Sequence, residues 1–505
     1  MLSKTVTAVT IGTEGKKIII ETDISRGMPG LTIVGLADTT VKESRERIRS
    51  AVNHIGKNFP VKRITVNLSP ANIWKKGSHF DLPMAIGILI SSGQIEQKQV
   101  EGYGFIGELS LDGTLNPCRG ILPMVMALRK EGIKKVIVPC ENREEAQLVK
   151  DISIYPAAGL KEVLFHLSGN KRIEVVRERK ETCTEGLKDA GDFRDVRGQQ
   201  MAKRAVTVAV AGGHGIFMMG SPSTGKTMIA ERIPGIMPEL SYDEIVEITE
   251  LYSVAGLLDE KTPYISRRPF RHPFHRITPA GFLGGGTVPV PGEISLAHKG
   301  VLFLDEVGEF DRRVIEALRI PLEKKSISIV RKGETCVFPA DFLLVAASNP
   351  CRCGYYGDPS GKCHCTLNEI RRYQSRISGP VLDRIDLQIH LQPVGYDTLS
   401  GENGEDSASM KRQIEKAREI QKYRYRGYAF DTNGSLDEHS LERFCRTDRE
   451  GNRLLKEAYV RLNLNPRTIG KVRKAARTIA DLEESETIRA EHIAEALQYR
   501  EQVKK

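Results

Sequence analysis

The segment GSPSTGKT, from Gly220 to Thr227, carries the residues whose chemistry is easiest to interpret. It fits the pattern G-x-x-x-x-G-K-[ST], follows the apolar run GIFMMG and precedes the helical run TMIAERI. Backbone N–H groups of such a loop point at phosphate oxygens, Lys226 supplies a cation for the β- and γ-phosphates, and the Thr227 hydroxyl is a Mg²⁺ ligand. The predicted ATP-binding loop consists of Gly220, Ser221, Pro222, Ser223, Thr224, Gly225, Lys226 and Thr227.

A pair of carboxylates stands at the end of another apolar run, GVLFLDEVGEF, which places Asp305 and Glu306 after a hydrophobic strand. A carboxylate beside a phosphate-binding loop can hold Mg²⁺ through water, and a second can take a proton from an attacking water. Taken alone, such a pair is more often a turn or a helix cap. After a phosphate-binding loop, we predict that Asp305 is a Mg²⁺ ligand and that Glu306 is the general base.

Asn349 ends a third apolar run, DFLLVAASNP, and its amide is suited to orient an attacking water. Two lone arginines follow, Arg384 in SGPVLDRID and Arg467 in LNPRTIGKVRKAARTIADL. A lone arginine after a helix is usually a surface residue. Their local sequence alone therefore predicts no function for these two arginines.

Four cysteines lie within the stretch NPCRCGYYGDPSGKCHC, directly after Asn349. The pattern C-x-C-x₉-C-x-C is formed by Cys351, Cys353, Cys363 and Cys365. Two such thiolate pairs on a Gly-rich hairpin can bind Zn²⁺ tetrahedrally with Zn–S distances of ~2.3 Å, and His364 could replace one thiolate. A disulfide within C-x-C would be strained. The spacing predicts structural zinc, with four reduced thiols as the alternative.

The segment KKSISIVRKGETCVFPADF reads as a β-hairpin with Arg331 and Lys332 at its tip. A basic hairpin tip can hold the phosphates of a nucleic acid backbone. Arg331 and Lys332 are therefore candidate DNA contacts, and an ordinary solvated turn is the alternative.

These residues need elements that position them, and a chain of 505 residues is long enough for two or three domains. Residues 1–170 alternate short β-branched runs with helical stretches, which is an α/β pattern, and a charged linker is expected over 171–192. A second α/β unit, 193–400, contains the three apolar runs that end at the residues discussed above. Residues 401–505 have helical periodicity, so we expect an all-helical domain there.

The composition, 40% apolar and 28% charged, is that of an ordinary globular protein. No apolar run approaches the roughly 20 residues that span a bilayer, and the N-terminus alternates like a strand instead of forming a signal peptide, so we expect a cytoplasmic protein without a membrane segment. The net charge is +10, and basic residues outnumber acidic ones in the last fifth of the chain. Such a surplus fits either a solvated surface or a polyanionic partner.

The order of phosphate-binding loop, DE strand, Asn-tipped strand, arginine and helical domain resembles that of AAA+ ATPases. The resemblance implies that Asn349 is sensor 1, that Arg384 is an arginine finger reaching the γ-phosphate of a neighbouring subunit, and that Arg467 is a sensor 2 residue that binds ATP. It implies ATP and Mg²⁺ as cofactors. A finger supplied to a neighbour requires a homo-oligomer, typically a hexameric ring.

The stretch RPFRHPFHRITPAGFLGGGTVPVPGEISLAHKGVLFLDE, with ISGPVLDRID, ARTIADL and HIAEALQYR, resembles the YifB/ComM family of magnesium-chelatase-like AAA+ proteins. The resemblance covers essentially the whole chain. The sequence departs from the family at Ser221 and Ser223 in the phosphate-binding loop, and at Phe274, where a second consecutive histidine is expected. It departs again at Asn465 and Pro466, where the family has a Ser-x-Arg helix start.

The first domain carries its own resemblance, because GELSLDGTLNPCRGILPMVMALRKEGIKKVIVPCENREEA is similar to the proteolytic domain of Lon protease. That enzyme uses a serine and lysine dyad. Leu122 occupies the lysine position, and GSHFDLP, which contains Ser78, replaces the run that carries the serine. A serine without a base to take its proton is only a surface hydroxyl, so we expect a degenerate, non-proteolytic domain used for assembly or substrate contact.

The expected architecture is α/β, with a degenerate Lon-protease-like N-terminal domain, an AAA+ P-loop NTPase core and a C-terminal all-helical lid. The resemblance implies an ATP-hydrolysing ring motor acting on single-stranded or branched DNA, similar to ComM-type helicases that promote branch migration in natural transformation or recombination. The alternative is a magnesium-chelatase-like ATPase that remodels a protein partner without DNA. The basic hairpin and helical domain favour DNA.

Overall fold

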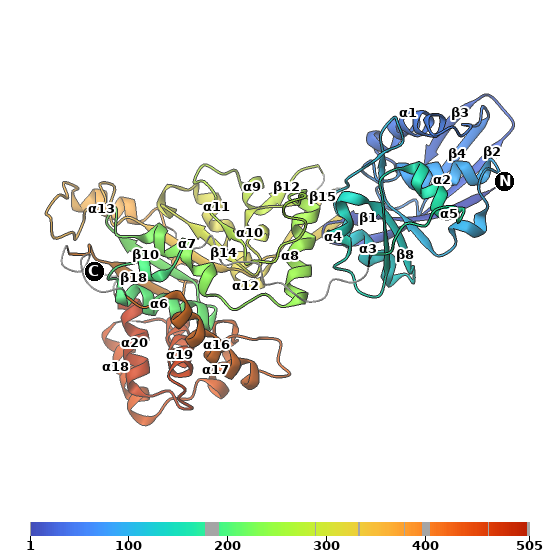
Figure 1. Ribbon diagram of the computed structural model, residues 1–505. Helices are drawn as coiled ribbons and strands as arrows, with labels where there is room; N and C mark the ends of the chain where they lie inside the picture. Colours follow the sequence, from blue (N-terminus) through green and yellow to red (C-terminus); the bar gives the residue numbers. More distant parts are fainter. Residues whose placement is uncertain are drawn as a thin grey trace.

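The structure, a computed structural model, describes residues 2–176, 191–287, 289–331, 334–377, 379–395, 404–462 and 464–501. It is a mixed α/β protein with an N-terminal mixed-sheet domain, a core built on a parallel sheet, and a C-terminal helical region. The predicted fold class is confirmed in these three parts. Figure 1 shows the N-terminal domain at one end of the molecule and the helical region below the core.

The N-terminal domain has a seven-stranded sheet in the order β3-β4-β2-β1-β5-β8-β9. Its strands are β1 (Ser3–Ile11), β2 (Glu14–Ser25), β3 (Gly30–Val34), β4 (Arg63–Ser69), β5 (Tyr103–Phe105), β8 (Lys135–Pro139) and β9 (Ser153–Ala157). Its helices are α1 (Thr39–His54), α2 (Asp81–Ser91), α3 (Ile121–Lys130), α4 (Arg143–Ala146) and α5 (Leu160–Leu167), and a small ribbon joins β6 (Glu108–Leu109) to β7 (Leu115–Asn116). Ala8 of β1 belongs to one hydrophobic cluster, with α3, and the next residue, Val9, belongs to another, with α2, so both faces of the sheet are covered.

The core sheet has five parallel strands in the order β11-β14-β17-β10-β18. Their bounds are β10 (Ile216–Gly220), β11 (Phe270–Arg271), β14 (Val301–Leu304), β17 (Leu343–Ser348) and β18 (Leu387–Leu391). The strands are buried on both faces, which explains why they read as continuous apolar runs. Ile216 and Met218 face one hydrophobic cluster, and Phe217 and Met219 face another.

Helices and two small hairpins surround this sheet. The helices are α6 (Gln200–Gly212), α7 (Lys226–Ile236), α8 (Tyr242–Ala255), α9 (Pro279–Leu283), α10 (Glu293–Leu296), α11 (Arg312–Ala317), α12 (Arg319–Lys324), α13 (Leu367–Gln374) and α14 (Gly379–Leu382). The hairpins pair β12 (Gly284–Gly285) with β13 (Val290–Pro291), and β15 (Ser326–Arg331) with β16 (Glu334–Pro339). The predicted hairpin before the Asn349 strand is therefore present.

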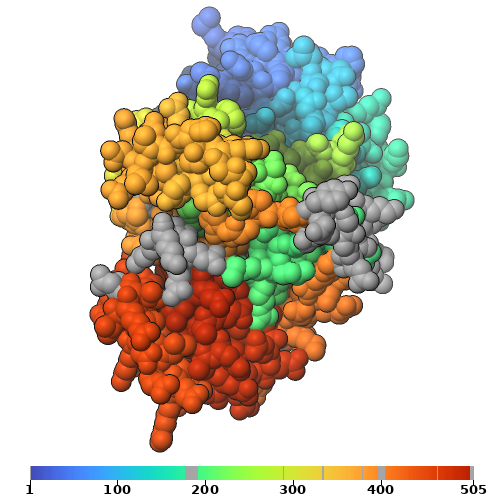
Figure 2. All heavy atoms as spheres, turned by 90° about the vertical axis from the view of Figure 1, so that its left-hand side faces the viewer, coloured from blue at the N-terminus to red at the C-terminus, as the bar shows by residue number. Residues whose placement is uncertain are grey.

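The C-terminal helical region consists of α16 (Ser407–Arg424), α17 (Glu438–Phe444), α18 (Arg449–Arg461), α19 (Pro466–Leu482) and α20 (Ala490–Glu501). One hydrophobic cluster runs from the core sheet through α6 into α16, α19 and α20, with Ala209, Ile414 and Ile479 among its fully buried members. The helical region therefore packs on the core as part of one interior. Figure 2 shows the segment around α13, in orange, as an exposed lobe above the red helices of this region.

Helix α8 joins the core to the N-terminal domain. Ile245 of α8 lies in the same hydrophobic cluster as Ile121 of α3. The hydroxyl of Tyr242 donates to the carbonyl of Leu148, and the hydroxyl of Ser253 donates to the buried carboxylate of Glu145. Apolar packing and buried hydrogen bonds thus fix the N-terminal domain against one helix of the core.

Candidate active site

The phosphate-binding loop connects the carboxyl end of β10 with the amino end of α7. Gly220 is the last residue of β10, and Lys226 is the first residue of α7. Between them, Ser223 and Gly225 have φ values of 65° and 89°, a left-handed conformation that turns the chain sharply. A side chain at Gly220 would lie 2.9 Å from the carbonyl oxygen of Leu391, so this position requires glycine. The result is a tight loop at a helix N-terminus, which is a favourable place for an anion.

The buried ammonium group of Lys226 links this loop to Asn349. It donates to the carbonyl oxygens of Gly220 at 2.7 Å and Ser221 at 2.9 Å, and to Oδ1 of Asn349 at 3.2 Å. Burial lowers the pKa of Lys226, and the charge of Asp305 opposes that change. The contact with Asn349 is possible because β10 and β17 are adjacent parallel strands, with Met219 opposite Ser348.

The Thr227 hydroxyl donates to Oδ2 of Asp305 at 3.0 Å. Asp305 and Glu306 follow β14 directly, and Glu306 is exposed with φ of 50°. Hydroxyl and carboxylate oxygens are the ligands that Mg²⁺ prefers, so Thr227 and Asp305 form a suitable pair. The structure thus brings the predicted loop, the carboxylate pair and Asn349 together at the carboxyl edge of the sheet, where ligands of parallel sheets bind.

Arg384 and Arg467 lie at the opposite, amino-terminal edge of the sheet. Arg384 precedes β18, and its guanidinium lies 2.7 Å from Glu323 of α12. Arg467, in the first turn of α19, lies 3.7 Å from the same carboxylate. Glu323 carried no sequence signal, because only the fold brings α12, α14 and α19 together.

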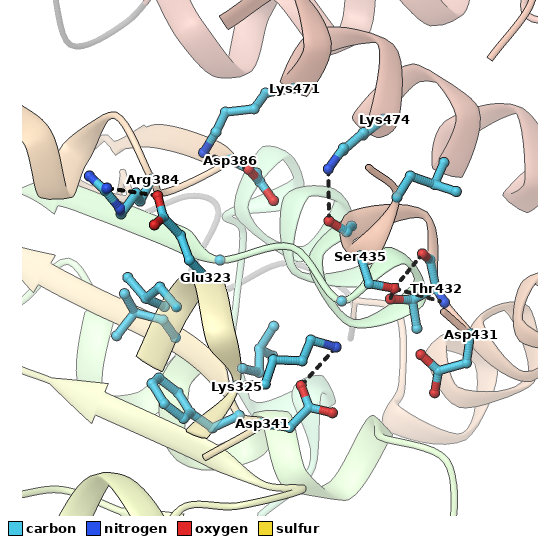
Figure 3. A pocket seen from close by; sticks show the side chains of 18 of the residues that line it. Glu323, Lys325, Asp341, Arg384, Asp386, Asp431, Thr432, Ser435, Lys471 and Lys474 are labelled. Atoms are coloured by element: carbon cyan, nitrogen blue, oxygen red, sulfur yellow. Dashed lines mark hydrogen bonds and ion pairs between the residues drawn. The ribbon is translucent and has the colours of Figure 1, made fainter. Parts of the chain in front are cut away.

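The two arginines line a cavity of about 1000 Å³ between the core and the helical region. Figure 3 shows Arg384 beside Glu323 in this cavity. The cavity reaches Gly215, Leu343 and Asp386, which precede or begin strands β10, β17 and β18. Strand β10 has five residues, so the two edges of the sheet are separated by about 16 Å. The structure does not bring Arg384 or Arg467 to the phosphate-binding loop of their own chain.

Asp386 anchors the helical region to this edge. Lys471 of α19 lies 2.8 Å from Asp386 (Figure 3). Nδ1 of His214 lies 3.1 Å from the same carboxylate. Burial acts to raise the pKa of Asp386, but Lys471 and His214 outweigh that effect and hold the pKa well below its ordinary value. Because Asp386 is two residues after Arg384, α19 and Arg384 are held by one charged network.

The four predicted cysteines converge in space. Their Sγ atoms all lie within 4.8 Å of one another, for Cys351, Cys353, Cys363 and Cys365. Three of the separations are 3.3, 3.8 and 3.6 Å. A tetrahedron with Zn–S bonds of ~2.3 Å has edges of about 3.8 Å. The cluster can therefore hold zinc.

The cysteine loop lies against the phosphate-binding loop. A Cβ at Gly354 would lie 2.7 Å from the ring of Pro222, and Asp358 accepts hydrogen bonds from Ser360 and Ser221, which lower its pKa. The cysteine cluster therefore lies beside the phosphate-binding loop of the candidate site.

The N-terminal domain lacks the groups for a Ser–Lys dyad at the predicted positions. Leu122 is completely buried in the domain core, and the Ser78 hydroxyl donates to the carboxylate of Glu108. The absence of proteolytic activity in this domain stays a prediction.

Arg331 is exposed at the end of β15. Lys332, the second predicted DNA contact, lies outside the described residues. Among the helices that the structure describes, none is both long enough and apolar enough to cross a membrane.

Three family models match the chain. The model described as magnesium chelatase, subunit ChlI, matches residues 192–399, that of the subunit ChlI of Mg-chelatase matches 20–142, and that of the ChlI C-terminal part matches 404–500. The three matches fall on the core, the N-terminal domain and the helical region of the structure, respectively. All three models describe parts of the magnesium-chelatase subunit ChlI.

Several known proteins are similar to the chain along its whole length. The competence protein ComM of Haemophilus influenzae is 40% identical over 500 residues, which cover 98% of this chain and 96% of that protein. The uncharacterized protein YifB of Escherichia coli is 39% identical over 496 residues, with 98% and 96% covered. The magnesium-chelatase 67 kDa subunit of Chlorobaculum tepidum is 25% identical over 162 residues, with 31% and 23% covered.

Proposed function

Because the chain belongs to the YifB/ComM family of magnesium-chelatase-like AAA+ proteins, we propose that it is an ATP-driven ring motor that acts on DNA. Membership of this family implies an ATPase that uses ATP and Mg²⁺. The observation that carries the proposal is the convergence of Lys226, Thr227, Asp305 and Asn349 at one edge of the sheet. The DNA substrate is supported by the similarity to a competence protein and by the exposed Arg331.

The first step of the proposed reaction is the binding of ATP by the loop. Lys226 exchanges the carbonyls of Gly220 and Ser221 for oxygens of the β- and γ-phosphates. Thr227 and Asp305 would hold Mg²⁺, which neutralises phosphate charge when it is bound. The loop N–H groups and the α7 N-terminus add further positive potential toward the phosphates.

The second step is the attack of water on the γ-phosphorus, which breaks its bond to the bridging oxygen and releases ADP and phosphate. Glu306, exposed directly beyond Asp305, takes a proton from the attacking water, and Asn349 orients that water. Asn349 is well supported for this role, because Lys226 already donates to its side-chain oxygen.

The third element is the neighbouring subunit. Arg384 and Arg467 share Glu323 at the edge opposite to the phosphate-binding loop, so we propose that both act on the ATP of an adjacent chain. A chain with these arginines at one edge and the phosphate-binding loop at the other would associate head to tail. Such a contact generates a ring when the rotation between neighbouring subunits closes. We propose a hexameric homo-oligomer.

We further propose three working units and a cytoplasmic location. The units are residues 1–170, 193–400 and 401–505, with a linker over 171–192, part of which lies outside the described residues. For the first unit, which Ser253 of α8 holds to the core through Glu145, we propose a role in assembly or substrate contact.

We also propose that the cysteine cluster holds one structural Zn²⁺. Untagged purified protein should contain about one zinc per chain by elemental analysis. Replacing both Cys363 and Cys365 with Ser should remove it and lower ATP turnover more than ATP binding, because the loop lies between Asn349 and Arg384 along the chain. Cys140→Ser, outside the cluster, is the control and should retain the metal. Zinc-free protein with four freely titratable thiols in the folded state would contradict the assignment.

The DNA part of the proposal is tested by ATP turnover with and without single-stranded and branched DNA. We expect turnover to rise with either DNA, and four-way junctions to be migrated when ATP is present. The second candidate is a magnesium-chelatase-like ATPase that remodels a protein, which the three family matches favour. Turnover that is stimulated by a protein and is indifferent to DNA would support that candidate.

A further inference from the structure

A small groove separates the N-terminal domain from the two hairpins of the core. It has a volume of about 140 Å³. The N-terminal domain contributes Leu36, Trp74 and Lys76, and the core contributes Pro289 and Arg331. Figure 1 shows β12 and β15 at the end of the core that faces the N-terminal domain. Residues far apart in the sequence thus form one surface at this junction.

The backbone around Lys75 fixes the orientation of the groove residues on the N-terminal side. The N–H of Lys75 donates to the carbonyl of Leu36 at 3.0 Å, and the N–H of Asp38 donates to the carbonyl of Lys75 at 3.0 Å. The Lys75 side chain is fully buried and donates to the carbonyl of Pro70. Because side chains alternate along extended backbone, Trp74 and Lys76 share the opposite side.

Trp74 and Lys76 form a local pair on that side. The ammonium of Lys76 lies 5.6 Å from the centre of the Trp74 ring. This is within the range of a cation–π interaction, so the two side chains support one another. Lys75 is therefore part of the interior of the domain, whereas Lys76 lies at the groove.

The hairpin side of the groove is also held in place. Cys336 of β16 is buried, and a Cβ at Gly12, in the turn between β1 and β2, would lie 3.3 Å from the Cβ of Cys336. In the register of the hairpin, Ile329 pairs with Cys336 and Arg331 pairs with Glu334. The packing of Cys336 thus places exposed Arg331 at the rim, close to the N-terminal domain.

The lining has the composition of a site for a single nucleic acid strand. It combines an indole and two cations with small polar and apolar groups. Base stacking on aromatic rings and neutralisation of phosphates by Lys and Arg are the two contributions to binding of unpaired strands. Paired bases of a duplex are stacked on one another and do not present a free face.

We propose that this groove binds one unpaired base of a DNA strand against Trp74, with Lys76 and Arg331 on the flanking phosphates. The inference rests on the proposed DNA function and names where and how the strand is held. Every base has a π face, so the site should show little sequence preference. The N-terminal domain thereby becomes a part of the DNA-binding surface.

The test uses the intrinsic fluorescence of the full-length protein, since the chain has a single tryptophan. Oligothymidylate should quench the emission of Trp74 to saturation, and anisotropy of the same labelled oligonucleotide should report binding independently. We expect Trp74→Ala to weaken binding about tenfold and Trp74→Phe to retain most of it. Lys76→Ala and Arg331→Ala should each reduce the log–log salt slope by about 0.7.

Lys62→Ala is the matched control, because Lys62 is exposed in the same domain and does not line the groove. It should bind with wild-type affinity and salt slope, and equal melting temperatures of all variants would exclude misfolding. If anisotropy shows binding while Trp74 emission is unchanged and the groove variants bind like wild type, the groove is not the site, although the motor proposal stands. If no DNA binds at about 50 mM salt, the DNA function itself fails. The inference would also be overturned if duplex DNA quenched the Trp74 emission as strongly as oligothymidylate. The same holds if polyglutamate, an anion without bases, displaced the oligonucleotide and quenched the emission equally.

Discussion

A Glu306→Gln variant should bind ATP and assemble like the wild type but hydrolyse ATP about 10²-fold more slowly or worse. The amide has nearly the shape of the carboxylate but cannot accept the proton of the attacking water. Glu306 is exposed beyond β14, so the change should not disturb the buried strand. Steady-state phosphate release and equilibrium binding of a fluorescent ATP analogue measure the two quantities separately.

Glu309→Gln provides the control for this experiment. Glu309 is three residues further along, and its carboxylate pairs with Arg376 at 3.0 Å. It should retain turnover close to that of the wild type, since an exposed ion pair contributes little to stability. Wild-type turnover in Glu306→Gln would exclude Glu306 as the general base. The proposed role of Asp305 as a Mg²⁺ ligand would be unaffected.

An Arg384→Ala variant should lose about 10³-fold in turnover or more, the effect expected for an arginine finger. Mixing it with a Lys226→Ala variant, which has an intact Arg384 but a defective phosphate-binding loop, should restore activity. In random head-to-tail assemblies of equal amounts, about a quarter of the interfaces combine an intact loop with an intact arginine. The mixture should therefore approach about a quarter of wild-type turnover, whereas each variant alone is inactive.

The decisive control for this mixing experiment is a double variant, Lys226→Ala with Arg384→Ala. Added to Arg384→Ala, it offers no arginine at any interface and should restore nothing. Recovery in neither mixture, with assembly shown by sedimentation, would mean that Arg384 acts within its own chain. The same design applies to Arg467, because both guanidinium groups contact Glu323.

The residues of the carboxyl edge could be predicted because each lies directly after a strand. The strands are buried on both faces, so they are visible as apolar runs that stop at Gly220, Asp305 and Asn349. In a parallel sheet, all such ends meet at one edge. Local sequence therefore predicts which residues lie together, and their roles in hydrolysis stay predictions.

The placement of Arg467 could not be predicted in this way. The resemblance assigned it to ATP binding, and the fold puts it beside Arg384 through a shared contact with Glu323. Its position depends on how α19 packs on the core. The ion pair between Lys471 of α19 and Asp386, which are far apart in the sequence, helps to fix that packing. The four cysteines are an intermediate case, since their spacing indicates a metal site but not its contact with Pro222.

The role proposed for Trp74 could not be predicted from the sequence, because nothing local distinguishes this residue. It follows β4 in an irregular segment, and its partners at the groove come from a hairpin more than two hundred residues away. The docking of the core on the N-terminal domain, through α8 and through Cys336, brings them together. Sites made at the contact of two domains have no sequence periodicity from which they can be read.

The separation of the phosphate-binding loop from Arg384 and Arg467 on opposite edges of one sheet has a quantitative consequence. Under the proposed role of these arginines, an isolated chain holds two unmatched half-sites. Specific activity is then a function of protein concentration: it falls on dilution below the dissociation constant of the interface, while the intrinsic affinity of each loop for ATP persists. In a cell, the expression level of such a chain would itself act as a threshold for its activity.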